Sequence, residues 1–196
     1  INVSDWLTQN FTINSTGILK PNGNLSVCNS TVTLENNGTL ETGENANVST
    51  YKIIRFTKGS KLEIKSGGQL IVNNNTKIVI ENGAKLTYFP GAKIVLDGSN
   101  AILEFDQSQL ELKSGAIFSV QSGTNGRGYL HFHHNWVEND PPSIICEDNT
   151  PEFNLSGTYT DKWQYYNDRL LKVTGNIGLV TDWKLKHFFI SKGFIA

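Results

Sequence analysis

The chain repeats one pattern of apolar and polar positions every eight residues. The pattern is clearest in residues 58–64, 66–72, 82–88 and 90–96, where a Gly is followed three and five residues later by apolar residues. Apolar side chains two residues apart on a strand point the same way, and Gly supplies a turn that needs positive φ. Each octad therefore predicts one corner followed by one short strand.

Two apolar rows follow from this spacing. The first row contains Leu62, Leu70, Ile78, Leu86, Ile94, Ile102, Leu110 and Phe118. The second contains Ile64, Val72, Ile80, Tyr88, Leu96, Leu112 and Val120, and is interrupted at Glu104. A helical period of 3.6 would not hold this phase. One octad cannot bury its apolar side but stacked coils can, so the rows predict the interior of a solenoid.

Three octads, or 24 residues, give the best alignment of the repeat with itself. Residues 58–64 then match 82–88, and residues 66–72 match 90–96 and 114–120. The outward positions sort by side into Glu63, Thr87 and Glu111; Ile71, Val95 and Ser119; and Val79 with Leu103. Parallel crossovers are normally right-handed. The sequence therefore predicts an all-β, right-handed parallel β-helix with about 8 residues per side and 24 per coil.

The repeat divides the chain into four parts. Residues 1–16 are expected to form an N-terminal cap or first strand, and residues 17–123 the solenoid repeats. Residues 124–150 break the pattern and contain Pro141 and Pro142, which predicts an inserted loop or hairpin. Residues 151–196 regain a weak eight-residue spacing at Trp163, Leu171 and Leu179, and are expected to form a further coil or a C-terminal cap.

Composition narrows the partners and the compartment. The net charge of −1 gives no electrostatic reason to expect nucleic acid as a partner. No apolar run approaches the roughly 18 residues of a membrane helix, so we expect no membrane insertion. The chain begins at Ile1 and contains no Met, which favours a processed form or a piece of a longer chain. A secreted or cell-surface location is the expectation.

Cysteines and glycosylation triplets leave alternatives open. Cys28 and Cys146 are two buried thiols in one interpretation and a single long-range disulfide in the other. The Asn-x-Ser/Thr triplets, Asn37 among them, are glycan acceptors in one interpretation. In the other they are a product of turn-rich composition.

The octads at residues 58–64, 82–88 and 90–96 resemble the Gly-Ala-Lys-Leu solenoid segments of Bacteroidetes surface and secreted proteins. The resemblance covers roughly residues 17–123 and implies export by the type IX secretion system. It carries no catalytic residue, because the matched motif contains none. The C-terminal sorting domain of such proteins is not recognisable in residues 150–196.

The sequence 129–136 suggests a metal site. His131 and His133 would share one face of a strand, as in a two-histidine metal clip, with Glu138, Asp140 and Cys146 nearby in sequence. The alternative is a partly exposed aromatic strand with incidental histidines.

Parallel β-helices also include polysaccharide-degrading enzymes, which need carboxylates grouped on one outer face. Glu63 and Glu111 form the only acidic column among the octads, and a solvated Lys/Glu ladder explains them equally well. Carbohydrate binding would use aromatic side chains that stack on sugar rings. The candidates are Trp136, Trp163, Tyr165 and Tyr166.

Outward apolar residues suggest a binding face. Ile71 with Val95, and Val79 with Leu103, would form stripes that face water unless residues 124–196 cover them. Exposed apolar patches usually mark a contact, here with a protein partner or a glycan.

The sequence favours an extracellular, non-enzymatic structural or adhesive β-solenoid that presents a binding face as a surface protein, exported cargo or spacer. A carbohydrate-binding or polysaccharide-degrading β-helix, and a subunit of a larger surface or secretion assembly, are the alternatives. No cofactor is predicted, because no cofactor motif is recognisable.

Overall fold

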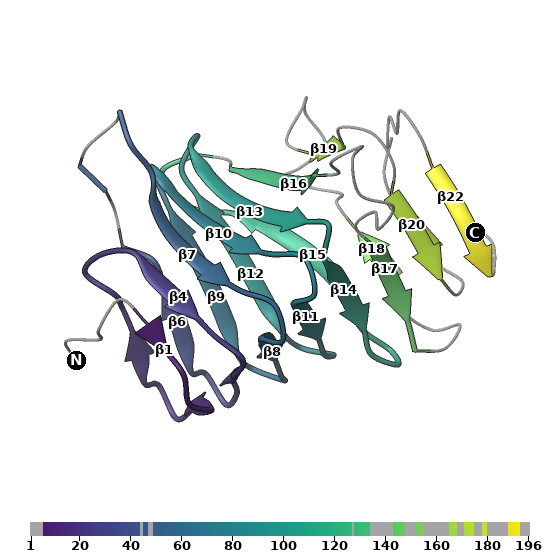
Figure 1. Cartoon of the computed structure of the whole chain (residues 1–196), viewed down its shortest axis with the longest axis horizontal. Coiled ribbons are helices and arrows are strands. Elements are labelled where there is room, and N and C mark those ends of the chain that lie inside the picture. The colour runs from purple at the N-terminus through teal and green to yellow at the C-terminus, as the bar shows by residue number, and fades with distance from the viewer. Residues whose placement is uncertain are drawn as a thin grey trace.

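The chain folds as a parallel β-solenoid of about 5 turns, with about 25 residues per turn (Figure 1). The computed structural model describes residues 6–43, 45–46, 49–126, 128–133, 143–147, 152–154, 165–167, 171–174, 178–179 and 188–192. These residues form strands, turns and bends but no helix, and so contain no helix able to cross a membrane. The predicted fold class is confirmed.

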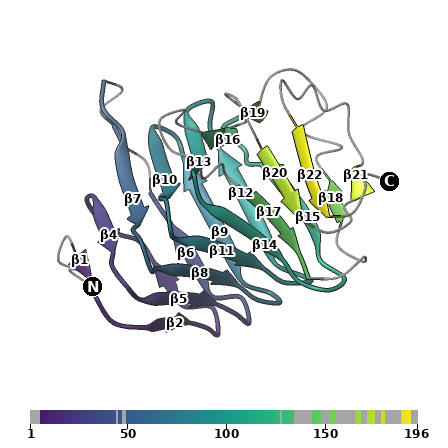
Figure 2. The same ribbon diagram turned by 45° about the vertical axis from the view of Figure 1, so that its right-hand side comes forward.

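Three parallel sheets form the sides of the solenoid. Sheet A contains, in spatial order, β1 (Trp6–Leu7), β4 (Leu25–Val27), β7 (Lys52–Phe56), β10 (Thr76–Ile80), β13 (Ala101–Asp106), β16 (Tyr129–His133) and β19 (Tyr165–Asn167). Sheet B contains β2 (Phe11–Ile13), β5 (Thr31–Leu34), β8 (Lys61–Ile64), β11 (Lys85–Tyr88), β14 (Gln109–Leu112), β17 (Ser143–Cys146), β20 (Leu171–Thr174) and β22 (Phe188–Lys192). Sheet C contains β3 (Ile18–Leu19), β6 (Thr39–Glu41), β9 (Gln69–Asn73), β12 (Lys93–Asp97), β15 (Ile117–Ser122), β18 (Glu152–Asn154) and β21 (Gly178–Leu179). Figure 2 shows the strands of sheet B, from β2 to β17, following one another along the stack.

The core consists of columns in which each apolar side chain lies beside its equivalent one coil away. One column of sheet B contains Val32, Leu62, Leu86, Leu110 and Ile144, all buried. Aromatic rings also pack against one another in the core. Phe105 stacks on Phe132 with ring centroids 4.9 Å apart, and Tyr88 meets Phe118 edge-on at 5.0 Å. Each buried aliphatic side chain contributes roughly 1.5–3 kcal/mol, which backbone ordering largely offsets.

The interruption of the second apolar row at Glu104 has a simple cause. Ile78 pairs with Leu103 and Val79 with Glu104, so this coil is one residue longer than the 24-residue repeat. The extra residue lies in the corner between β12 and β13. Leu103 therefore points into the core and is fully buried, whereas Ile102 is only half-buried. The assignment of Leu103 to an outward stripe was wrong for this reason.

A second shift affects sheet C. Ile94 pairs with Val120 and Val95 with Gln121, because the corner between β14 and β15 is also longer. Ser119 therefore does not lie beside Val95, as the uniform 24-residue spacing predicted.

Residues 124–150 contribute strands to the solenoid. Strand β16 pairs in register with β13, and β17 pairs in register with β14. Leu130, Phe132 and Ile144 extend the buried columns. These parts of the segment continue the coil, where an inserted loop or hairpin was expected. An antiparallel bridge joins Gly123 to Gly126. Pro141 and Pro142 lie outside the described residues.

The first and last parts of the chain also supply strands. Strands β1 and β2 pair with β4 and β5, and β18 to β22 extend the three sheets in residues 152–192. Cys28 and Cys146, which both belong to the described part, are thiols.

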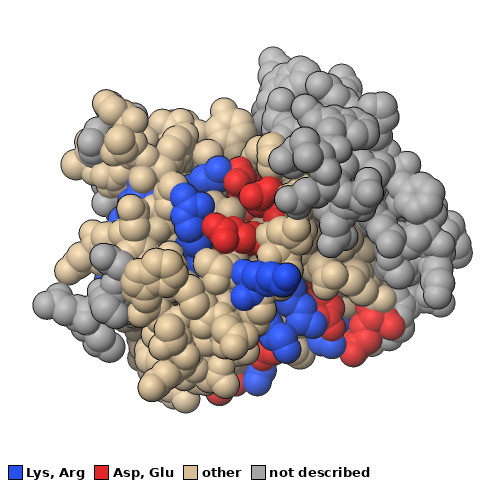
Figure 3. All heavy atoms as spheres, in the orientation of Figure 1, with Lys and Arg blue, Asp and Glu red and all other residues tan. Residues whose placement is uncertain are grey.

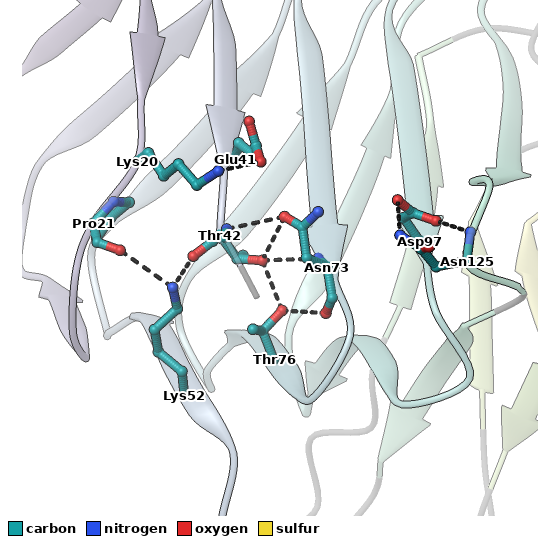
Figure 4. Close-up of polar contacts among 10 residues, drawn as sticks. Lys20, Pro21, Glu41, Thr42, Lys52, Asn73, Thr76, Asp97 and Asn125 are labelled. Atoms are coloured by element: carbon teal, nitrogen blue, oxygen red, sulfur yellow. Dashed lines mark hydrogen bonds and ion pairs between the residues drawn. The ribbon is translucent and has the colours of Figure 1, made fainter. Parts of the chain in front are cut away.

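A buried polar network fixes the corner between sheets C and A (Figure 4). The Thr76 hydroxyl donates to the backbone carbonyl of Asn73 at 2.5 Å. It also lies 2.7 Å from the Thr42 hydroxyl, and because its own proton is already used, Thr42 is the donor in this contact. The Thr42 hydroxyl oxygen in turn accepts from the backbone N–H of Asn73 at 2.8 Å. The Asn73 side-chain oxygen accepts from the Gly43 amide at 2.9 Å. Thr42 and Thr76 are fully buried, so these groups have replaced water by each other.

Lysine side chains complete the same corner. The Lys52 ammonium donates to the Pro21 carbonyl at 3.2 Å and to the Thr42 carbonyl, while Lys20 and Glu41 form an ion pair of 2.8 Å beside it. Burial lowers the pKa of Lys52, the charge of Lys20 lowers it further, and Glu41 opposes both. The ammonium thus links the carbonyl groups of two coils.

A second polar contact joins the end of β12 to residue 125. Asn125 donates to both carboxylate oxygens of Asp97, from its backbone N–H at 2.6 Å and from its side-chain amide at 3.1 Å.

Replacing Thr42 by Val should lower the free energy of unfolding by about 1–3 kcal/mol, because it leaves the buried backbone N–H of Asn73 without its acceptor and removes one of the two contacts of the Thr76 hydroxyl. Denaturant unfolding followed by circular dichroism measures the change. Thr12→Val, at an exposed position of β2, is the control and should change stability by less than about 0.5 kcal/mol. Equal midpoints for the two variants would show that the network does not stabilise the corner.

Candidate functional site

The outer face of sheet A holds a group of charged and titratable side chains that contact one another. Arg55, Val79, Glu104 and His131 occupy equivalent outward positions on β7, β10, β13 and β16. Figure 3 shows positive and negative side chains gathered in the middle of the face that Figure 1 presents. The parallel register is the cause, because it places residues from successive coils about one strand spacing apart, roughly 4.8 Å.

Glu104 is the centre of this group. Its Oε2 atom accepts hydrogen bonds from Lys77 Nζ at 2.6 Å and from His131 Nδ1 at 2.8 Å, and the residue is only 8% exposed. Burial alone would raise the pKa of Glu104, but the hydrogen bonds from His131 and Lys77 lower it to about 2. The ionised carboxylate only accepts, so His131 carries its proton on Nδ1.

Asp106 lies two residues along β13 on the same face and pairs in register with His133. Burial raises its pKa, and the nearby charges of Glu104 and Glu81 add to this effect, while His133 opposes it. The rings of His131 and His133 meet edge-on with centroids 5.5 Å apart. Two carboxyl groups on one strand therefore have pKa values shifted in opposite directions.

The two histidines share a face, as the strand pattern predicts, but the metal site stays a prediction. His131 directs Nδ1 at Glu104, which also binds Lys77. Within the described ranges, no group of three or more His, Cys, Asp and Glu side chains is arranged to hold a metal ion. Cys146 lies on sheet B and packs in the core. Glu138 and Asp140 lie outside the described residues.

The acidic column of sheet B has the predicted register, since Glu63, Thr87 and Glu111 pair across β8, β11 and β14. Glu111 binds Lys85 and Lys113, each at 2.7 Å, and accepts from the Thr87 hydroxyl at 3.3 Å. Burial raises the pKa of Glu111, but the hydrogen bonds from Lys113 and Lys85 outweigh it and lower the pKa to about 2. Glu111 therefore pairs with a lysine one coil away, as the Lys/Glu interpretation proposed, whereas Glu63 forms no ion pair within the described residues.

Comparison of the chain with family models, curated proteins and solved structures gives no match. The β-solenoid fold is thus established by the strand pairing alone.

The predicted apolar binding face is reduced to one pair. Leu103 is in the core, and Val79 is outward in register but only 3% exposed. Ile71 and Val95 lie side by side on sheet C and are half-buried. Glu41 and Gln121 continue the same column on either side, so the apolar surface spans two coils.

The aromatic candidates for sugar stacking are placed only in part. Trp136 and Trp163 lie outside the described residues. Tyr165 and Tyr166 belong to β19, where their backbones pair with Leu130 and His131. Stacking by these four residues therefore stays a prediction.

Sequence reasoning identified the histidines but missed their partners. Glu104 and Asp106 come from β13, 25 to 29 positions before the histidines, and Lys77 comes from β10, 54 and 56 positions before them. The signal was present at Glu104, a charged residue between Leu103 and Phe105 in an otherwise apolar row. Glu104 falls on an outward position only if the repeat is counted with the extra residue in the corner between β12 and β13.

Proposed function

We propose that this chain is a non-enzymatic structural β-solenoid of a secreted or surface protein, which holds a rigid outer surface against a protein or glycan partner. One observation carries the proposal. The acidic groups best placed for chemistry, Glu104 and Glu111, are each bound by two basic side chains from the same or neighbouring coils. Carboxylates held in this way fix the shape of a surface and are poorly available for proton transfer.

Location and assembly belong to the same proposal. The resemblance of the repeats to Bacteroidetes solenoids supports export, with type IX secretion as the route. Within the described residues, β1, β2 and β3 are each paired on one side only. Since an unpaired strand edge is a template for further pairing, a place in a larger chain or assembly is consistent with this end of the stack.

A carbohydrate-active enzyme is the second candidate. Glu104 and Asp106 favour it, because pairs of carboxyl groups with separated pKa values are typical of acid and base roles in glycoside hydrolysis. The contacts of Glu104 with Lys77 and His131 oppose it.

The two candidates differ in whether polysaccharide is cleaved. We expect the purified protein to bind a surface polysaccharide or protein in affinity electrophoresis or pull-down and to release no reducing ends. Asp106→Asn should leave that binding unchanged. Release of reducing ends by the wild type that disappears in Asp106→Asn but persists in Glu63→Gln would contradict the scaffold proposal and support the enzyme.

A further inference from the structure

We propose that a small cavity at the corner between sheets A and B binds a single anionic sugar residue, a hexuronate, of an acidic glycan. The cavity has a volume of about 210 Å³ and is lined in part by Lys61, Lys85, Gln107, Gln109 and Ser143. Pockets for drug-sized ligands are larger, roughly 300–1,000 Å³. The volume therefore suits one ring and not a longer ligand. The inference rests on the proposed scaffold function and names the ligand class for one part of its surface.

The cavity exists because neighbouring corners differ in length. Residues 57–60 and 81–84 form four-residue turns, closed by hydrogen bonds from Ser60 N to Thr57 O at 2.9 Å and from Ala84 N to Glu81 O at 2.8 Å. Their third residues, Gly59 and Gly83, have φ of 81° and 78°. The next corner, residues 106–108, is one residue shorter and turns at Gln107 with φ 52°. The cavity lies at this step between long and short corners.

The rim of the cavity is basic. Lys61 and Lys85 are the first residues of β8 and β11 and pair in register. No carboxylate lines the cavity among the described residues. Lys85 already binds Glu111, but Lys61 is exposed and forms no ion pair within the described part of the chain. The Lys61 ammonium can therefore bind an anionic group that enters the cavity.

The rest of the lining suits a sugar. Gln109 and Ser143 continue the Lys61 and Lys85 column across β14 and β17. Amide and hydroxyl side chains both donate and accept hydrogen bonds, as sugar hydroxyl groups do. A fully ionised inorganic anion only accepts hydrogen bonds, so it would match the donors of these side chains but not their acceptor oxygens.

The test uses the full chain and backbone amide NMR shifts, with D-glucuronate, D-galacturonate and D-mannuronate as probes. D-glucose is the uncharged counterpart and inorganic sulfate the free anion. We expect at least one hexuronate to shift the amides of Gly59, Gly83 and Gln109 in a saturable way. Lys61→Gln should weaken its binding by about tenfold or more. Glu63→Gln should strengthen binding, because it removes a negative charge from the same face of β8.

Lys93→Gln is the matched control. Lys93 is also the exposed first residue of a strand and forms no ion pair within the described ranges, but it lies on sheet C. Binding should be unchanged in this variant. The inference is overturned if none of the three hexuronates shifts the cavity amides, if glucose or sulfate binds as tightly, or if Lys93→Gln weakens binding as much as Lys61→Gln. Such results would leave the scaffold proposal intact, whereas cleavage of polysaccharide would overturn the scaffold proposal and not the cavity.

Discussion

Replacing Leu86 by Asp is expected to unfold the central coils of the solenoid at neutral pH. Leu86 is fully buried and lies between Leu62 and Leu110, with further apolar neighbours at each end of the same column. The change removes a large apolar side chain and places a carboxyl group where no water reaches it. We expect a loss of at least about 4 kcal/mol from a stability that for domains is roughly 5–15 kcal/mol.

Denaturant unfolding followed by far-ultraviolet circular dichroism and by tryptophan fluorescence measures this loss. Ile117→Asp is the control, because Ile117 is a similar aliphatic residue of the same solenoid but is 52% exposed. Its free energy of unfolding should change by less than about 0.5 kcal/mol. A stable Leu86→Asp variant with a midpoint close to that of Ile117→Asp would show that the inner column does not hold the coils together.

Glu104→Gln is expected to lower the free energy of unfolding by about 2–3 kcal/mol at pH 7. The substitution removes the negative charge that Lys77 and His131 both contact and leaves the Lys77 ammonium without its ion pair. Because the pKa of Glu104 falls from 4.5 to about 2 on folding, the ionised carboxylate stabilises the folded state. Thermal and denaturant unfolding of both proteins at pH 7 give the difference.

The pH dependence of this difference has a definite sign. A carboxyl group with a lowered pKa in the folded state contributes its full stabilisation above its unfolded pKa of about 4.5. That contribution is lost as the pH falls toward 2. The stability difference between wild type and Glu104→Gln should therefore shrink as the pH falls from 4.5 to 2. Glu111 titrates in both proteins and cancels from the comparison.

Two further variants isolate the interaction. Glu63→Gln removes a carboxylate that forms no ion pair within the described residues, and should change stability by less than about 0.5 kcal/mol. A double-mutant cycle with Lys77→Met separates the Lys77 contact from that of His131. A Glu104→Gln variant as stable as Glu63→Gln at every pH would mean that Glu104 is not held as the structure shows.

The repeat was readable from sequence where the coils have equal length. Leu62, Leu86 and Leu110 are separated by the predicted 24 residues, and their column is confirmed. Glycine marks the corners there because Gly59 and Gly83 have positive φ, which other residues seldom adopt. Elsewhere Asn29 and Gln107 also have positive φ, so more corners share this conformation than the glycine positions alone indicate.

The prediction failed where corners change length. One added residue before β13 reverses the faces of Ile102 and Leu103, because the side-chain period of a strand is two. A longer separation hid β16 and β17, since strands 14 positions apart do not fit an eight-residue rhythm. The partners of His131 could not be found in advance, because a contact between residues of successive coils depends on this register.

Because the corners differ in length while the strands stay paired, changes in corner length are independent of changes in the core of this molecule. Strands keep their pairing whether the coil that joins them has 24 or 25 residues, since the added residue lies in a corner between two sheets. Insertions and deletions in the corners can therefore create pockets and protrusions on the surface without changing the hydrophobic core. A scaffold of this design can acquire a new recognition site by losing one amino acid, without a matching adjustment anywhere in its packing.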